Sequence, residues 1–233
     1  MNTLTEQQSL RFEVSDNDIV TLWLDGDGRP VVVLDRHLIQ RLNSTLDEIE
    51  VLKGIKGLML KSDCERVFVA GADLAEIDTL DDQGLHGYLA FGTTVFSRIA
   101  KLPYPTVALI NGAALGGGLE IAMAADIRIG ARDSGRVGLP EINLGVLPGT
   151  GGTQRLVRMV GKARAIELMT TGRLISFEEA HDLDIINEIF ENENFDEQVM
   201  NYAKQFTLPN KAVKAVGNIK RSFSRKKPAE ESK

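Results

Sequence analysis

The sequence predicts an α/β fold in which helices cover the sheets. Short apolar segments, such as residues 57–62 and 105–111, alternate with longer segments whose apolar side chains recur at helical spacing. The short segments are apolar at nearly every position, which is typical of strands buried on both faces. With 233 residues, 43% of them hydrophobic, the chain is long enough for one large domain or two small ones.

The elements of the first half follow from the spacing of apolar residues. Residues 10–15 and 18–24 flank Asp16-Asn17 and predict a β-hairpin. Residues 36–52 place six apolar side chains at helical spacing and predict an amphipathic helix. The other predictions here are a loop at 26–30, a strand at 57–62, a strand ending at Ala70-Gly71, a helix from about Asp73, a helix at 84–101 and a strand at 105–111.

The second half is predicted to become mostly helical past residue 150. The predicted elements are a helix at about 116–124, a strand at 126–131, helices at 152–160, 162–171 and 176–182, a strand at 185–191 and helices at 195–205 and 209–221. The acidic segment 191–198 is the best candidate linker, so we expect a core of residues 1–195 and a C-terminal helical region of 196–221. Residues 222–233, rich in Ser, Lys, Pro and Glu, predict a disordered tail.

Composition and charge argue against several classes of protein. The net charge of -6 disfavours a general nucleic-acid binder, which needs clustered Lys and Arg. A single cysteine cannot form an intrachain disulfide. The chain contains no stretch of about 18 apolar residues, so no membrane span is predicted. The first residues lack the basic start and apolar run of a secretion signal. We therefore expect a cytoplasmic protein without a membrane or nucleic-acid partner.

Several familiar ligand motifs do not fit the chain. Residues 145–153 are rich in glycine but lack the Gly-Lys-Ser/Thr of a phosphate-binding loop. Residues 25–29 begin like a calcium loop, yet Arg29 and Arg36 occupy positions that need oxygen ligands. The three histidines are far apart and have no partner at ligand spacing, so no metal site is predicted.

Three turns marked by glycine remain as candidate parts of a site. They are "FVAGADLAEI" (68–77), "GAALGGGLEIA" (112–122), and "VGLPEINLGVLPGTGGTQRL" (137–156). In the first, Asp73 is placed to accept hydrogen bonds from the free amides of a helix start. The second and third each carry a glutamate, Glu120 and Glu141.

The second turn suggests stabilisation of an oxyanion. A helix start presents unpaired N–H groups and partial positive charge, and glycines there let a ligand approach the backbone. Glu120 lies three residues after Gly117 on the same helical face, and burial would raise its pKa and suit it to proton transfer. For this turn alone, close helix packing and a first-turn acid explain the pattern equally well. Three such turns, two of them with an acid, favour a site.

The same three segments resemble the enoyl-CoA hydratase/isomerase (crotonase) superfamily. The resemblance also includes the segment from "LPEINLGV" to "DIINEIF" and covers about residues 10–205, with all landmarks in order. It implies a spiral of ββα units and C-terminal helices that trimerise, here shorter than in other members. It implies an acyl-CoA thioester as substrate and a homotrimer or a dimer of trimers. Coenzyme A enters as part of the substrate, and no cofactor is implied.

The resemblance also assigns roles to residues. The amides of Ala72 and Gly117 would hold the thioester carbonyl in an oxyanion hole. Glu120 and Glu141 match the two glutamates of the hydratases, in which the counterpart of Glu120 acts mainly as base on the water that attacks C3 and the counterpart of Glu141 delivers a proton to C2. Residues expected along the coenzyme A path are Ala70, Asp73, Leu74, Ala75 and Gly116.

The most direct implication is hydration of trans-2-enoyl-CoA thioesters, because the pair of glutamates distinguishes hydratases within the superfamily. A Δ3-Δ2-enoyl-CoA isomerase, a decarboxylase and a thioester hydrolase stay open as alternatives, since this superfamily supports several reactions on one site. A non-catalytic subunit that binds acyl-CoA is a further alternative. A binding module would, however, have no use for a costly buried pair of acids.

Overall fold

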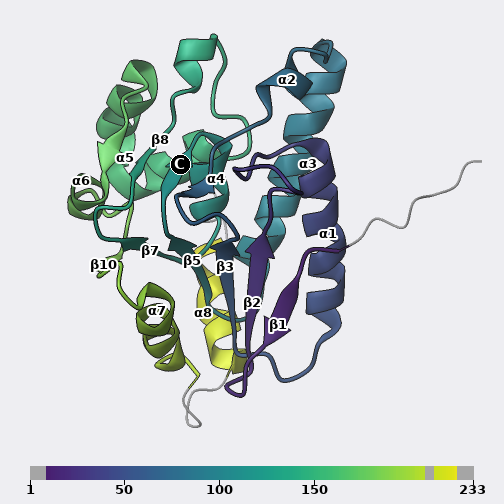
Figure 1. Ribbon diagram of the computed structural model, residues 1–233, viewed down its shortest axis with the longest axis vertical. Coiled ribbons are helices and arrows are strands. Elements are labelled where there is room, and N and C mark those ends of the chain that lie inside the picture. Colours follow the sequence, from purple (N-terminus) through teal and green to yellow (C-terminus); the bar gives the residue numbers. More distant parts are fainter. Residues whose placement is uncertain (1–8, 208–212, 225–233) are drawn as a thin grey trace, which may run out of the picture.

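The computed structural model describes residues 9–207 and 213–224, whose strands form two sheets (Figure 1). The larger sheet has the order β1-β2-β3-β5-β7-β10 and the smaller one β4-β6-β8-β9. The strands are β1 (Phe12–Val14), β2 (Ile19–Leu24), β3 (Gly57–Ser62), β4 (Val67–Val69), β5 (Thr106–Ile110), β6 (Ala113–Leu115), β7 (Ile127–Ala131), β8 (Arg136–Gly138), β9 (Ile175–Ser176) and β10 (Glu188–Phe190).

The chain alternates between the two sheets as it proceeds. Each of the pairs β3–β4, β5–β6 and β7–β8 places its first strand in the larger sheet and its second in the smaller sheet. Neighbouring strands run parallel, except where β1 and β9 pair antiparallel with β2 and β8. Parallel strands need a crossover between them, and here the second strand and a helix supply it. The predicted α/β class is confirmed.

Helices cover the sheets and enclose the core. They are α1 (Arg36–Val51), α2 (Leu74–Ile77), α3 (Asp82–Lys101), α4 (Gly117–Ala122), the 3-10 helix η1 (Glu141–Leu144), α5 (Gly152–Thr171), α6 (Phe177–Asp182), α7 (Phe195–Lys204) and α8 (Val213–Ser224). In Figure 1, α1 and α3 lie on one side, α5 and α6 on the other, and the short α4 lies between them. A second cluster forms where Phe195 and Val199 of α7 pack with Met59 and neighbouring residues of the larger sheet. No helix among the described residues is long and apolar enough to cross a membrane.

Most predicted elements are confirmed within a few residues. The hairpin forms as β1 and β2, and the predicted helices 152–160 and 162–171 correspond to two halves of α5. Gly161, with φ +77°, interrupts α5 between those halves. The predicted disorder from Ser222 is wrong for its first residues, because α8 continues to Ser224, and the rest of that tail lies outside the described residues.

Three of the four strands of the smaller sheet are missing from the sequence prediction. A helix was expected to follow strand 105–111 directly, but β6 intervenes, and β8 and β9 were not predicted either. Each has two or three residues, too few to show a period of two, and β6 consists of Ala113, Ala114 and Leu115. Pairing with β4 and with one another makes these segments strands, which no local pattern reveals.

Arg128 of β7 is a buried cation that binds residues just before its own strand and residues in the segment 185–187. Its side chain donates to Ile185 O at 2.6 Å, Ala125 O at 2.8 Å and Asn187 Oδ1 at 2.8 Å, and the residue is only 4% exposed. Burial lowers its pKa to about 10, and Asp126 opposes the shift. This residue therefore links the start of β7 to the segment that leads into β10.

Arg128→Leu is expected to lower the free energy of unfolding by about 3 kcal/mol, because buried acceptors lose their donors. Urea unfolding followed by circular dichroism measures the change. The matched control is Arg132→Leu, which removes an exposed ion pair with Glu191 just past the same strand and should lower the free energy of unfolding much less. Equal losses in the two variants would contradict the structural role of Arg128.

Candidate active site

Gly116 and Gly117 form the centre of the candidate site, where β6 turns into α4. Gly116 has φ +52°, a backbone conformation that L side chains rarely adopt. A Cβ atom there would also lie 2.9 Å from Glu141 Oε1. A Cβ atom at Gly117 would lie 2.7 Å from Leu34 Cδ1 and 3.9 Å from Glu120 Oε2. The glycines therefore let two carboxylates and one leucine converge on a bare backbone.

The amide of Ala72 faces this backbone. Leu34 forms an isolated parallel bridge with Ala72. Leu34 N donates to Gly71 O at 2.7 Å, and Leu34 O accepts from Asp73 N at 3.2 Å. Because N–H groups alternate sides along an extended chain, the Ala72 amide points away from Leu34. A Cβ atom at Gly117 would lie 3.9 Å from this nitrogen. Within the described residues the Ala72 amide donates no hydrogen bond, and Gly117, as the first residue of α4, has no intrahelical acceptor.

Glu120 is held from one side by the glycine-rich turn before α5. Its Oε1 accepts hydrogen bonds from the amides of Thr150 (2.8 Å) and Gly152 (2.6 Å), and its Oε2 accepts one from Thr150 Oγ1 (2.5 Å). The residue is 3% exposed. Burial raises the pKa of Glu120, while these hydrogen bonds and the charge of Arg155 act in the opposite direction.

Glu141 begins η1 and has a different environment. Its Oε2 is buried, and it has no hydrogen-bond partner in the part of the chain that the structure describes. Burial raises the pKa of Glu141 to about 7; its own amide opposes the shift, and the charge of Glu120 adds to it. The site thus pairs one carboxyl group with several donors and one with an unsatisfied oxygen.

The other predicted residues lie on the segment from β4 to α2. Ala70 donates its amide to Val32 O at 2.8 Å, and Asp73 caps α2 by accepting from Ala75 N at 3.0 Å and Glu76 N. The cap predicted for Asp73 is confirmed. Leu74 is 48% exposed, so this segment reaches the solvent. Contact between these residues and coenzyme A stays a prediction.

Sequence reasoning did not single out Thr150 or Arg155. Thr150 supplies two of the donors to Glu120, and Arg155 donates to Thr150 O at 2.8 Å. A Cβ atom at Gly152 would lie 2.8 Å from Glu120 Oε1, so the glycine admits the carboxylate. The only hint in the sequence was the glycine-rich turn, which indicates that another group packs closely against its backbone but does not identify that group.

Comparison with known proteins identifies similar sequences and structures. A family model described as enoyl-CoA hydratase/isomerase matches residues 27–232. The probable enoyl-CoA hydratase of Bacillus subtilis (strain 168) is 44% identical over 159 residues, which make up 68% of this chain and 61% of that protein. The aligned part therefore spans less than two thirds of the length of this relative.

Solved structures match over most of the chain. The enoyl-CoA hydratase of Bacillus anthracis has a TM-score of 0.86 and 32% identity, covering 94% of this chain and 83% of its own. The enoyl-CoA hydratase of Geobacillus kaustophilus HTA426 has a TM-score of 0.85 and 33% identity, covering 93% of this chain and 80% of its own.

Proposed function

Because the chain belongs to the enoyl-CoA hydratase/isomerase family, we propose that it is a lyase that adds water across the double bond of trans-2-enoyl-CoA thioesters. The crotonase-like spiral fold expected from the sequence is confirmed by the structural matches. The observation that carries the proposal is the convergence of two glutamates and two free amides on Gly116 and Gly117. A hydration reaction needs these two kinds of group together.

The amides of Ala72 and Gly117 are proposed to bind the thioester carbonyl oxygen. Attack of water at C3 moves negative charge onto this oxygen and forms an enolate. Two N–H groups held at a helix start stabilise that charge, and one such donor typically contributes about 3–4 kcal/mol to transition-state stabilisation. Leu34 packs beside Gly117 and excludes water from that side.

Glu120 is proposed as the base and Glu141 as the acid. Burial raises the pKa of Glu120, but three hydrogen bonds and nearby Arg155 oppose this shift and favour the ionised form, which can take a proton from the attacking water. Burial favours the protonated form of Glu141, whose pKa of about 7 suits delivery of a proton to C2. During the addition Glu120 takes a proton from the attacking water and Glu141 gives one to C2, and proton exchange with solvent then returns Glu120 to the ionised form and Glu141 to the protonated form before the next turnover. Because the two neighbouring carboxyl groups titrate as a pair, this assignment of base and acid describes the form in which Glu120 is ionised and Glu141 is protonated.

Thr150→Val is expected to lower kcat by about 10-fold, because it removes the hydroxyl donor to Glu120 Oε2 and keeps the shape of the side chain. Without that donor the pKa of Glu120 rises further, so the acid limb of the pH–kcat profile should move to higher pH. Arg155 and Glu141, the charged groups that face Glu120, are unchanged in this variant. Thr150→Ser, which keeps the hydroxyl, is the control, and an unshifted acid limb in Thr150→Val would contradict the prediction.

The direct test incubates purified protein with a panel of thioesters and follows products by mass spectrometry. Hydration adds the mass of one water to crotonyl-CoA and longer trans-2-enoyl-CoA substrates. An isomerase would shift the double bond of 3-enoyl-CoA without a change in mass, a decarboxylase would release carbon dioxide, and a hydrolase would release free coenzyme A. Failure of every trans-2-enoyl thioester to gain water would refute the proposal. Binding of acyl-CoA without any turnover would instead favour the non-catalytic subunit.

Other properties stay predictions. Residues 9–207 and 213–224 contain no group of three or more His, Cys, Asp or Glu side chains arranged to hold a metal ion. That the reaction requires no cofactor, that the chain forms a homotrimer or a dimer of trimers, and that it is cytoplasmic are expectations from the sequence. The boundary between residues 195 and 196 is likewise an expectation.

A further inference from the structure

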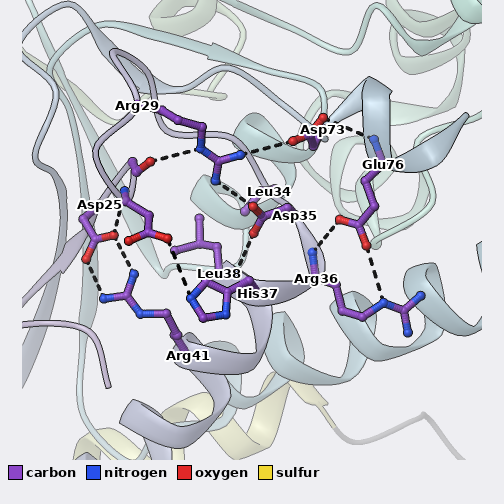
Figure 2. A network of polar contacts seen from close by, with 12 residues as sticks. Asp25, Arg29, Leu34, Asp35, Arg36, His37, Leu38, Arg41, Asp73 and Glu76 are labelled. Carbon is purple, nitrogen blue, oxygen red and sulfur yellow. Dashed lines mark hydrogen bonds and ion pairs between the residues drawn. The ribbon is translucent and has the colours of Figure 1, made fainter. Parts of the chain in front are cut away.

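Arg29 joins the capping residues of two helices that begin beside the site (Figure 2). Its Nη2 lies 2.6 Å from Asp35 Oδ2, and its Nη1 lies 3.1 Å from Asp73 Oδ2. Its Nε donates to Gly26 O at 3.0 Å, so the guanidinium is also tied to its own turn. One side chain therefore binds its own turn and the capping residues of both helices.

Each aspartate uses one oxygen for its helix and the other for Arg29. Asp35 Oδ1 accepts from Leu38 N at 2.7 Å and caps α1. Asp73 Oδ1 accepts from the amides of Ala75 and Glu76 and caps α2. A planar guanidinium can bind two carboxylates in fixed directions at once, which a lysine ammonium on a flexible stem cannot do with the same geometry.

The two caps directly follow residues of the candidate site. Asp35 comes after Leu34, whose side chain packs at Gly117, and Asp73 comes after Ala72, whose amide faces Gly117. Leu34 and Ala72 are themselves bridged through Gly71 O and Asp73 N. The link through Arg29 thus lies one residue away from both members of this bridge.

We propose that Arg29 is a positioning residue for the oxyanion hole, which sets the place of the Ala72 amide by fixing the two caps relative to each other. The proposal rests on the proposed function, in which Ala72 donates to the thioester carbonyl. Without the guanidinium, the carboxylates of Asp35 and Asp73 repel each other with no cation between them, so the segment carrying Ala72 is held less precisely relative to Gly117.

Loss of Arg29 should leave the fold intact, because other contacts also join these segments. Glu76 Oε2 accepts from Arg36 N at 2.8 Å, and Leu34 N donates to Gly71 O at 2.7 Å. The Arg29 side chain is 34% exposed, so its ion pairs are partly screened by water. The expected effect is therefore on the precision of the site and less on global stability.

The test compares Arg29→Met and Arg29→Lys with a matched control, Arg98→Met. Arg98 also binds α1, through Asn43, Asp47 and Glu50 at the other end of the helix. With crotonyl-CoA, Arg29→Met should lower kcat by about 10-fold to 100-fold while KM changes by less than about threefold, because a small displacement of a donor affects mainly the transition state. Arg29→Lys should restore only part of kcat, and Arg98→Met should leave kcat within about twofold of wild type.

A second readout needs no activity. Amide hydrogen exchange should be faster in Arg29→Met at Leu38, Ala75 and Glu76, the amides bound by the two caps, and unchanged there in Arg98→Met. An active wild type whose Arg29→Met variant keeps its kcat would overturn the positioning role alone. A wild type that hydrates no enoyl thioester would overturn the proposed function, and unchanged exchange in Arg29→Met would then overturn the link between the caps as well.

Discussion

Glu120→Gln is expected to slow hydration of crotonyl-CoA by about 10²-fold to 10⁴-fold, because an amide cannot take a proton from the attacking water. The substitution suits the surroundings. A glutamine carbonyl oxygen at the place of Oε1 would still accept from the amides of Thr150 and Gly152, and its NH₂ could donate to Thr150 Oγ1, since a hydroxyl can accept as well as donate. The lower kcat of Glu120→Gln therefore reflects the loss of the base and not disruption of the fold.

The measurement is kcat and KM with crotonyl-CoA, together with thermal unfolding of the same preparation. We expect KM to change little, because the proposed role of Glu120 is exerted in the transition state. A folded Glu120→Gln protein that retains wild-type kcat would refute the two-carboxylate mechanism. An inactive variant that also fails to unfold cooperatively would show that Glu120 is needed for the fold, and Thr150→Val then tests its chemical role separately.

Glu141→Gln is expected to lower kcat by a similar factor of about 10²–10⁴, because it removes the group that delivers a proton to C2. Glutamine keeps the size of the side chain beside Gly116, where Glu141 Oε1 lies 2.9 Å from the position of an added Cβ atom. Steady-state kinetics with crotonyl-CoA checks the result. If Glu120 and Glu141 act as a unit, the double variant should be scarcely slower than either single variant.

The pH dependence of stability tests Glu141 without any substrate. Its pKa is raised from 4.5 to about 7 by burial, so the folded protein holds this proton more tightly than the unfolded chain. The favourable contribution is fully present below about pH 4.5 and is lost as pH rises through about 7. Relative to Glu141→Gln, the wild type should therefore lose stability between these values. Parallel curves of unfolding free energy against pH for the two proteins would contradict the raised pKa.

Much of the fold could be predicted because long helices and buried strands have local patterns. The apolar spacing of α1 and the continuous apolar run of β5 depend only on neighbouring residues. The smaller sheet could not be predicted in this way, since β6, β8 and β9 have two or three residues each. Their strand geometry depends on partners far away in the sequence.

The candidate site likewise combines features that depend on local sequence with contacts between distant residues. Gly116, Gly117 and Glu120 belong to one turn, and the physical reasons for an oxyanion site at a helix start are local. Donors such as Thr150 lie 30 residues from Glu120, and their hydrogen bonds could not be read from spacing. Arg29 was interpreted only as a reason to reject a calcium loop, whereas the structure places it between two helix caps.

The sequence by itself determined the α/β class, the helix starts and the presence of two glutamates beside glycine-rich turns. These features depend on backbone propensity and on which side chains a short segment can bury. Only the tertiary structure decided which carboxyl group receives several donors and which keeps an oxygen without a partner, although burial raises the pKa of both. Desolvation and hydrogen bonding come from the elements that fold around each group, so Glu120 and Glu141, alike in the sequence, become different in the folded chain.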